Sequence, residues 1–257
     1  MAASLSFAKV TKCFATAAKT PLVAVRDLNF KTERGEFVSV IGPSGCGKST
    51  ILNMVSGLDF PTEGDILLDG ERVTGPSHRV GFMLQKDLLL PWRTIIENVC
   101  FGMEVRGLTR QEMRERAMHE LMRCRIENMA DSYPHQLSGG MRQRAALART
   151  LAIRPDLILL DEPFSALDAQ TKLVLQDSFS KTIGAEGIST VLITHDLQEA
   201  VLMSDRIFLM LGRPGTIVET IKLDLPSRMD PIARRNNPKT LEYVEHLFNA
   251  LHIGEDS

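Results

Sequence analysis

The sequence predicts an α/β fold with a mostly parallel sheet core, an antiparallel β part and an inserted helical subdomain. Three observations lead to this class. Short apolar runs alternate with segments of helical periodicity, which is typical of strands covered by helices on both faces. Residues 64–80 instead hold two short strand signals on either side of the turn dipeptide Asp69-Gly70. Charged, helix-favouring residues dominate from about residue 87 to residue 151.

The elements follow in order along the chain. Apolar alternation or clustering predicts strands at Leu5–Val10, Leu22–Leu28, Glu36–Ile41, Val80–Leu84, Leu157–Leu160 and Thr190–Thr194. A helix is expected after Lys48, with an apolar face made of Ile51, Leu52, Val55 and Leu58. Thr109 and Glu112 form a capping box that predicts the start of a helix over Thr109–Arg125. A last amphipathic helix carries Leu241, Val244, Phe248 and Leu251, which are expected to pack on the chain's own sheet; binding of a partner is the alternative.

Composition excludes several classes of protein. Of the 257 residues, 44% are hydrophobic and 24% charged, so a globular core is available. The net charge of −2 indicates no attraction to nucleic acid, and no apolar stretch approaches the roughly 18 residues that span a bilayer. The four cysteines are scattered, which favours reduced thiols in a cytosolic compartment over a zinc site or disulfides. Residues 1–26 are basic without an apolar core, so an organellar transit peptide stays open as an alternative to a structural segment.

A phosphate-binding loop is the most specific motif. The segment 42–49 reads GPSGCGKS, which fits G-x-x-x-x-G-K-[ST], and it lies between a buried strand and an amphipathic helix. In this context a phosphate loop is favoured over a glycine-rich turn, because backbone N–H groups and the helix N-terminus can surround a phosphate. Lys48 would reach the β- and γ-phosphates, and the Ser49 hydroxyl would reach Mg²⁺. The predicted nucleotide-binding residues of the loop are Gly42, Pro43, Ser44, Gly45, Cys46, Gly47, Lys48, Ser49 and Thr50. The core is therefore predicted to be of the P-loop NTPase type.

Two adjacent carboxylates follow the predicted strand at Leu157–Leu160. Open α/β sheets bind their ligands at the carboxyl ends of the strands. Asp161 is predicted to hold Mg²⁺, directly or through water, and Glu162 to polarise the attacking water as a general base. The alternative is a solvated acidic turn, but the phosphate loop in the same chain favours catalysis.

A second glycine-rich motif resembles the signature of ATP-binding cassette (ABC) ATPases. Residues 137–144 read LSGGMRQR, with Met141 where glutamine is more usual. The resemblance implies that two cassettes pair head to tail, so that each signature closes on the partner's phosphate loop. Ser138, Gly139 and Gly140 would then bind nucleotide in trans, together with Asp168, which ends a segment similar to the family's D-loop.

Three further residues fall in the cassette order. Gln85 resembles the Q-loop glutamine, which contacts metal and water and faces the membrane partner, and His195 resembles the switch histidine that contacts the γ-phosphate. Phe14 lies where the family has an aromatic residue, more often tyrosine, that stacks on adenine; a core phenylalanine is the alternative. The resemblance covers about residues 5–225. It implies one nucleotide-binding domain over 1–257, with a catalytic core at 1–86 and 152–225, a helical subdomain at 87–151 and a C-terminal extension at 226–257.

The transport class of cassette is favoured over two others. Translation-type proteins carry two cassettes in one chain, and DNA-repair cassettes carry long coiled coils between phosphate loop and signature; here about ninety residues separate Lys48 from Ser138. Segments 89–92, 133–144 and 212–215 resemble the ATPases of nitrate/sulfonate/taurine-type importers. This implies ATP and Mg²⁺ as cofactors and a peripheral place at the cytoplasmic face of the inner membrane. The implied partners are a second cassette, permease subunits and, indirectly, an extracytoplasmic binding protein, with no nucleic acid.

The solute and the role of one segment stay open. A small oxyanion such as nitrate or an organosulfonate is the leading expectation, and other small solutes, including thiamine precursors, are alternatives. The run Leu88–Trp92, which holds the single tryptophan, fits either subdomain core or a groove for a permease coupling helix.

Overall fold

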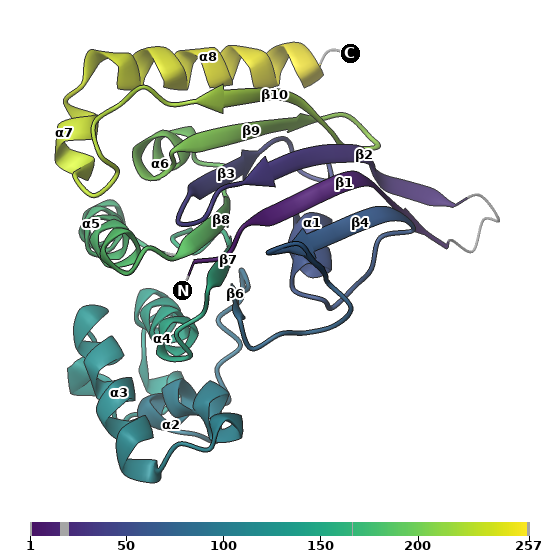
Figure 1. Ribbon diagram of the computed structural model, residues 1–257. Coiled ribbons are helices and arrows are strands. Elements are labelled where there is room, and N and C mark those ends of the chain that lie inside the picture. Colours follow the sequence, from purple (N-terminus) through teal and green to yellow (C-terminus); the bar gives the residue numbers. More distant parts are fainter. Residues whose placement is uncertain (1, 16–20, 166, 256–257) are drawn as a thin grey trace.

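The computed structural model describes residues 2–15, 21–165 and 167–255, and it confirms the predicted α/β class (Figure 1). Six strands form the central sheet in the order β10-β9-β3-β8-β7-β6. Their bounds are β3 Phe37–Ile41, β6 Val80–Met83, β7 Leu157–Asp161, β8 Ser189–Ile193, β9 Arg206–Leu211 and β10 Thr216–Lys222. Strands β9, β3, β8, β7 and β6 are parallel, and β10 pairs antiparallel with β9.

Both faces of this sheet are covered, as the continuous apolar strands predict. Along β7, Ile158 and Leu160 pack with helices α4 and α5, whereas Leu157 and Leu159 pack with α1 and the second sheet. The alternation follows from the two-residue period of a strand. The helices concerned are α1 Lys48–Val55, α4 Gly139–Ala152, α5 Ala169–Glu186 and α6 Leu197–Met203.

The second sheet is antiparallel, in the order β2-β1-β4-β5. Its strands are β1 Leu5–Phe14, β2 Leu22–Thr32, β4 Glu63–Leu68 and β5 Glu71–Arg72. The predicted turn joins β4 to β5, with φ of 52° at Asp69 and 83° at Gly70, the positive values that a tight hairpin turn needs. Strands β1 and β2 are longer than predicted, because β1 continues past Val10 to Phe14, which pairs with Leu22, and β2 continues past Leu28 to Thr32, which pairs with Leu5.

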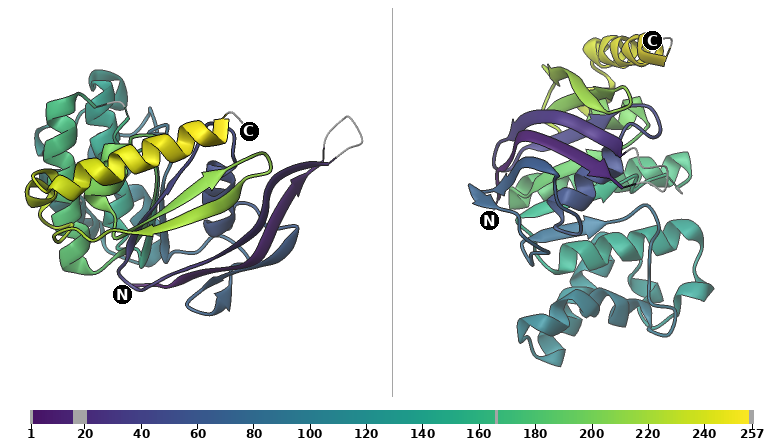
Figure 2. Two further views of the ribbon diagram at one scale, coloured as in Figure 1. Left: turned by 90° about the horizontal axis from the view of Figure 1, so that it is seen from above. Right: turned by 90° about the vertical axis from the view of Figure 1, so that its right-hand side faces the viewer.

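Helices gather at one end of the molecule (Figure 2). They are α2 Ile95–Cys100, the 3₁₀ segments η1 Phe101–Arg106, η2 Glu127–Met129 and η3 Pro134–Gln136, α3 Arg110–Arg123, and α4. The predicted capping box is confirmed: the Thr109 side chain accepts from the Glu112 backbone N–H, and Glu112 accepts from the Thr109 N–H. Among the described residues, no helix is long and apolar enough to cross a membrane.

The C-terminal segment forms α7 Pro231–Arg235 and α8 Pro238–Glu255, at the opposite end of the molecule from α2 and α3 (Figure 2). Leu247 is fully buried, and Val244 and Leu251 pack beside it against the β9–β10 side of the core. The predicted packing is wrong for Leu241 and Phe248, which are 63% and 52% exposed. Both residues lie roughly 100° around the helix axis from Leu247, which is at the centre of the buried face of α8.

The first helix also ends earlier than predicted. Helix α1 stops at Val55, and Leu58 is 61% exposed instead of joining the apolar face of Ile51 and Leu52. Gly57 (φ 75°) follows the helix cap at Ser56, in the left-handed conformation that commonly ends a helix.

Candidate active site

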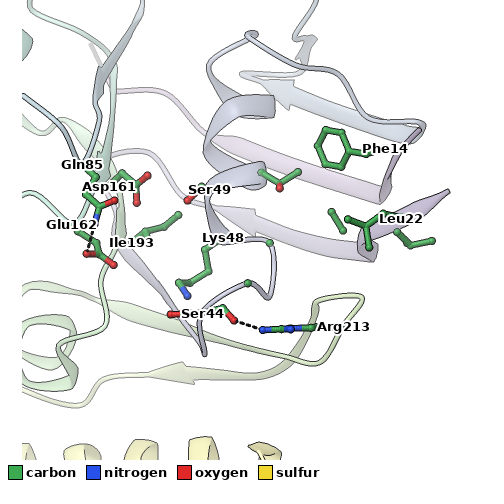
Figure 3. A pocket seen from close by; sticks show the side chains of 15 residues that line it. Phe14, Leu22, Ser44, Lys48, Ser49, Gln85, Asp161, Glu162, Ile193 and Arg213 are labelled. Carbon is green, nitrogen blue, oxygen red and sulfur yellow. Dashed lines mark hydrogen bonds between the residues drawn. The ribbon is translucent and has the colours of Figure 1, made fainter. Parts of the chain in front are cut away.

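A cavity of about 420 Å³ opens where the carboxyl ends of β3, β6, β7 and β8 meet the tip of the β1–β2 pair (Figure 3). Ten of the predicted site residues line it: Phe14, Ser44, Gly45, Gly47, Lys48, Ser49, Thr50, Gln85, Asp161 and Glu162. Five lining residues were not predicted as site residues: Leu22, Val23, Ala24, Ile193 and Arg213. Segments far apart in the sequence thus line the same cavity, which is large enough for a nucleotide.

The phosphate loop has the shape that its glycines permit. Gly45 and Gly47 have φ of 83° and 97°, and Gly47 is the N-cap of α1, so the loop turns sharply into the helix N-terminus. The Lys48 Nζ donates to the carbonyl oxygens of Gly42 and Pro43 at 2.7 and 2.9 Å, which holds the ammonium group over the loop. Cys46 is buried, and burial raises the pKa of its thiol, so any contact it makes to phosphate comes from its backbone.

The first carboxylate suits a cation. Burial raises the pKa of Asp161 above its ordinary value and the charge of Glu162 adds to this, whereas a hydrogen bond from Ser49 and the charge of Lys48 lower it. A half-buried carboxylate beside a hydroxyl, at the end of a phosphate loop, is the donor set that Mg²⁺ uses together with nucleotide phosphates. Ser49 and Asp161 would hold the ion, with Gln85 in the same cavity.

The second carboxylate lies between two polar side chains. Gln85 Nε2 donates to Glu162 Oε2 at 3.0 Å, and His195 Nδ1 lies 3.1 Å from Glu162 Oε1. The Glu162 backbone has φ of 49°, uncommon for a residue other than glycine, and its N–H donates to Ile193 O at 2.9 Å. Gln85 and His195 are therefore each within hydrogen-bond reach of Glu162, the residue predicted to polarise the attacking water. His195 contacts Glu162 without being among the described residues that line the cavity.

Phe14 lies at the far end of the cavity from the carboxylates (Figure 3). It is 37% exposed, so it is not the core phenylalanine of the alternative interpretation, and its ring face is 4.9 Å from Lys12 Nζ. Its cross-strand partner Leu22 and the next β2 residues form the adjoining wall. The length of the β1–β2 pairing brings this wall to the site, and sequence periodicity alone did not reveal it.

The loop between β9 and β10 is the main feature that the sequence did not indicate as part of the site. Arg213 Nη2 donates to Ser44 O at 2.9 Å (Figure 3). A Cβ added on Gly45 would lie 2.9 Å from the same nitrogen, so the guanidinium occupies the space of a side chain there. Gly215 exchanges backbone hydrogen bonds with β2, and a Cβ on it would lie 1.8 Å from Cys46 O. In the sequence, the two glycines of the segment 212–215 were the feature that could have indicated this close contact.

The four residues predicted to act in trans are not among the described residues that line the cavity: Ser138, Gly139, Gly140 and Asp168. Ser138 is the N-cap of α4 and accepts from Met141 N at 3.3 Å, and Asp168 is the N-cap of α5. The glycines thus open a helix N-terminus, as predicted, on a different element from the phosphate loop. That these four residues act on the nucleotide of a second chain stays a prediction.

Known proteins resemble the chain over most of its length. A protein-family model described as ABC transporter matches residues 25–165. The chain is 42% identical over 235 residues to the nitrate import ATP-binding protein NrtD of Synechocystis (90% of this chain, 88% of the relative). It is 40% identical over 223 residues to the aliphatic sulfonates import ATP-binding protein SsuB of Bacillus cereus (87% of each). The solved dimeric structure of the ATP-binding cassette MJ0796, in a post-hydrolysis state with ADP and Pi, superposes with a TM-score of 0.79. It has 33% identity, over 85% of this chain and 98% of that one.

The fold, the phosphate loop with its carboxylates, and these relatives agree. The chain belongs to the ATP-binding proteins of the ABC transporter family, and it is an ATPase that uses ATP and Mg²⁺.

Proposed function

We propose that this ATPase powers the uptake of a small oxyanion, nitrate or an organosulfonate, through a separate membrane permease. The observation that carries the proposal is a groove in the helical part of the molecule, seven residues along the chain from Gln85, with the exposed Trp92 in its lining. The similarity to the nitrate and sulfonate import proteins supports the solute class. The chain would lie peripherally at the cytoplasmic face of the inner membrane, and an extracytoplasmic binding protein would deliver the solute to the permease.

The groove has a volume of about 550 Å³ and lies between α2, α3 and the preceding loop; its lining is Trp92, Arg93, Ile96, Glu97, Cys100, Glu104, Arg110, Met113 and Arg114. Leu89 is buried in the helical core, as the core interpretation of the 88–92 run expects. Trp92 is 71% exposed, which supports the groove interpretation for that residue. An apolar and charged groove of this kind suits a short amphipathic helix of a partner.

A short chain segment links this groove to the active site. Gln85 contacts Glu162, and seven residues later Trp92 borders the groove. The segment between them is held by buried Asn98, which accepts from Leu90 N at 2.7 Å and donates to the carbonyl oxygen of Leu90 at 3.1 Å. Movement of a permease helix in the groove would therefore be passed to the glutamine that orients water.

The chemistry assigned to the chain's own residues is general-base catalysis with charge stabilisation. Glu162 takes a proton from the attacking water, while Gln85 and His195 orient the water molecule. General-base catalysis of this kind contributes on the order of 10²- to 10⁴-fold to the rate. Lys48 and the loop N–H groups stabilise the phosphates. A second copy, paired head to tail, would supply its Ser138 helix N-terminus to the same phosphates.

Uptake experiments test the solute class. Deletion of the gene should abolish uptake of labelled nitrate or of labelled taurine, and the wild-type gene should restore it, whereas Glu162→Gln should not. Normal uptake of both solutes in the deletion strain, with loss of a different solute such as a thiamine precursor, would contradict the oxyanion assignment and leave the import assignment standing.

The groove is tested by co-purification with the permease. Trp92→Ala should weaken retention of the permease at least about tenfold, since exposed tryptophans that become buried at interfaces often carry 2 kcal/mol or more. Phe248→Ala is the matched control, because it truncates a half-exposed aromatic residue at the other end of the molecule. Equal retention by the two variants would remove the groove from the interface.

Mixing inactive variants tests the pairing of two copies. Lys48→Ala damages the phosphate loop, and Ser138→Arg obstructs the helix N-terminus that would face the partner's phosphates. A mixed dimer holds one site with both lesions and one intact site, so part of the activity should return. Full hydrolysis by a dilute sample that is monomeric by light scattering would exclude the head-to-tail site.

A further inference from the structure

Two polar side chains of α5 reach the loop that carries His195. Lys172 Nζ lies 2.8 Å from Asp196 Oδ2 and 3.8 Å from Glu199 Oε1. Gln176 Nε2 donates to Glu199 Oε1 at 3.1 Å. Lys172 and Gln176 are four residues apart, so they lie on one face of α5 and hold the same carboxylate.

Glu199 in turn contacts both neighbours of the histidine, Thr194 through its carboxylate and Asp196 through its backbone N–H. Glu199 is 3% exposed and forms a hydrogen bond with Thr194 Oγ1, which also accepts from Asp196 N at 3.0 Å. Asp196 Oδ1 accepts from Glu199 N at 2.9 Å and caps α6. The His195 side chain itself is 67% exposed, so its direction toward Glu162 depends on how these flanking residues are held.

Lys172 also connects these contacts to Asp168, at the start of α5. Asp168 is the N-cap of α5, and its carbonyl accepts from Lys172 N at 2.8 Å, so Lys172 occupies the first turn of the helix. A displacement of Asp168 therefore moves the base of the Lys172 side chain. A hydrogen bond joins Asp168 to Lys172, an ion pair joins Lys172 to Asp196, and Asp196 is the chain neighbour of His195.

We infer that Lys172 is a positioning residue that sets His195 against Glu162, and that it conveys the position of the Asp168 turn to this histidine. The second half of the inference rests on the proposed pairing of two copies, in which the partner contacts Asp168. The first half rests only on contacts within the chain.

Kinetics of the full-length chain test the positioning role. Lys172→Met removes the charge and keeps the length of the side chain, and it should lower kcat between about tenfold and a hundredfold, as expected for a misplaced catalytic group, with the KM for ATP within about twofold. Lys172→Arg should restore most of the rate. The matched control is Lys181→Met on the same helix, where Lys181 pairs with Asp177 at 2.9 Å away from this loop. In a His195→Ala background, Lys172→Met should cause less than a further twofold loss.

A spectroscopic readout is independent of turnover. The His195 imidazole resonance, identified by its loss in His195→Ala, should shift in Lys172→Met and stay in place in Lys181→Met. If Lys172→Met does not fold, Asp196→Asn breaks the same ion pair and can keep the α6 cap, and the same shift is expected. An unmoved His195 resonance, or full additivity of the Lys172 and His195 variants, would overturn the inference. Loss of hydrolysis in Glu162→Gln, with wild-type turnover as reference, checks the ATPase chemistry separately.

Discussion

Gly215→Ala tests how closely the β9–β10 loop supports the phosphate loop. The added Cβ would lie 1.8 Å from Cys46 O and 2.3 Å from Met210 Cε. The methionine end can rotate away, but the carbonyl belongs to the phosphate loop. To reach 3.0 Å, the carbonyl and the Cβ must separate by a further 1.2 Å. The Cys46 carbonyl shares its peptide plane with the Gly47 N–H, so the displacement disturbs a donor of the phosphate cradle.

The magnitude follows from the kind of atom that must move. Overpacking costs about 1–3 kcal/mol, and we expect the upper end because the obstacle is backbone. For a chain of this size, about 3 kcal/mol corresponds to a fall in Tm of roughly 6–12 °C. Loss of one charge-assisted hydrogen bond to phosphate, about 1.5–3 kcal/mol, would weaken ATP binding by roughly tenfold to a hundredfold.

Thermal unfolding and calorimetric titration with ATP and Mg²⁺ measure both effects. Gly75→Ala is the matched control, because a Cβ there meets no atom within 4 Å and Gly75, like Gly215, has no positive φ. The reasoning is refuted if Gly215→Ala and Gly75→Ala have the same Tm and the same affinity for ATP.

Three further predictions concern the carboxylates and the lysine. Glu162→Gln should retain ATP binding and lower hydrolysis at least about a hundredfold in single-turnover assays; near-wild-type turnover would exclude its role as base. Lys48→Ala should abolish productive ATP binding, and an unchanged dissociation constant in calorimetry would mean that the loop is misinterpreted. Burial alone would raise the pKa of Asp69, but hydrogen bonds from Ser4 and Arg79 outweigh it and lower the pKa to about 2. The associated stability is present above about pH 4 and lost as the pH falls toward 2, so Asp69→Asn, which tolerates the positive φ, should flatten the dependence of Tm on pH in this window. The same acid dependence in both proteins would contradict this assignment.

Local spacing was enough to predict much of the site. The phosphate loop depends on glycines that allow positive φ within six residues, and the strand and helix beside it depend on periodicities of a few residues. The carboxylate pair at Asp161 and the capping box at Thr109 are equally local. Each of these was visible in the sequence because the physical cause acts between near neighbours in the chain.

Contacts between distant segments were decided only by the tertiary structure. Arg213 meets Ser44 across 169 residues of chain, because β9 lies next to β3 in the sheet and its loop therefore ends beside the phosphate loop. The face of α8 that is buried was likewise set by Leu247 packing on the sheet, against the predicted place of Phe248. Only the packed molecule fixes the register, the order of the strands and the fit of one surface on another. A rotation of a helix by one residue changes which side chains are buried, but it does not change the spacing of apolar residues in the sequence.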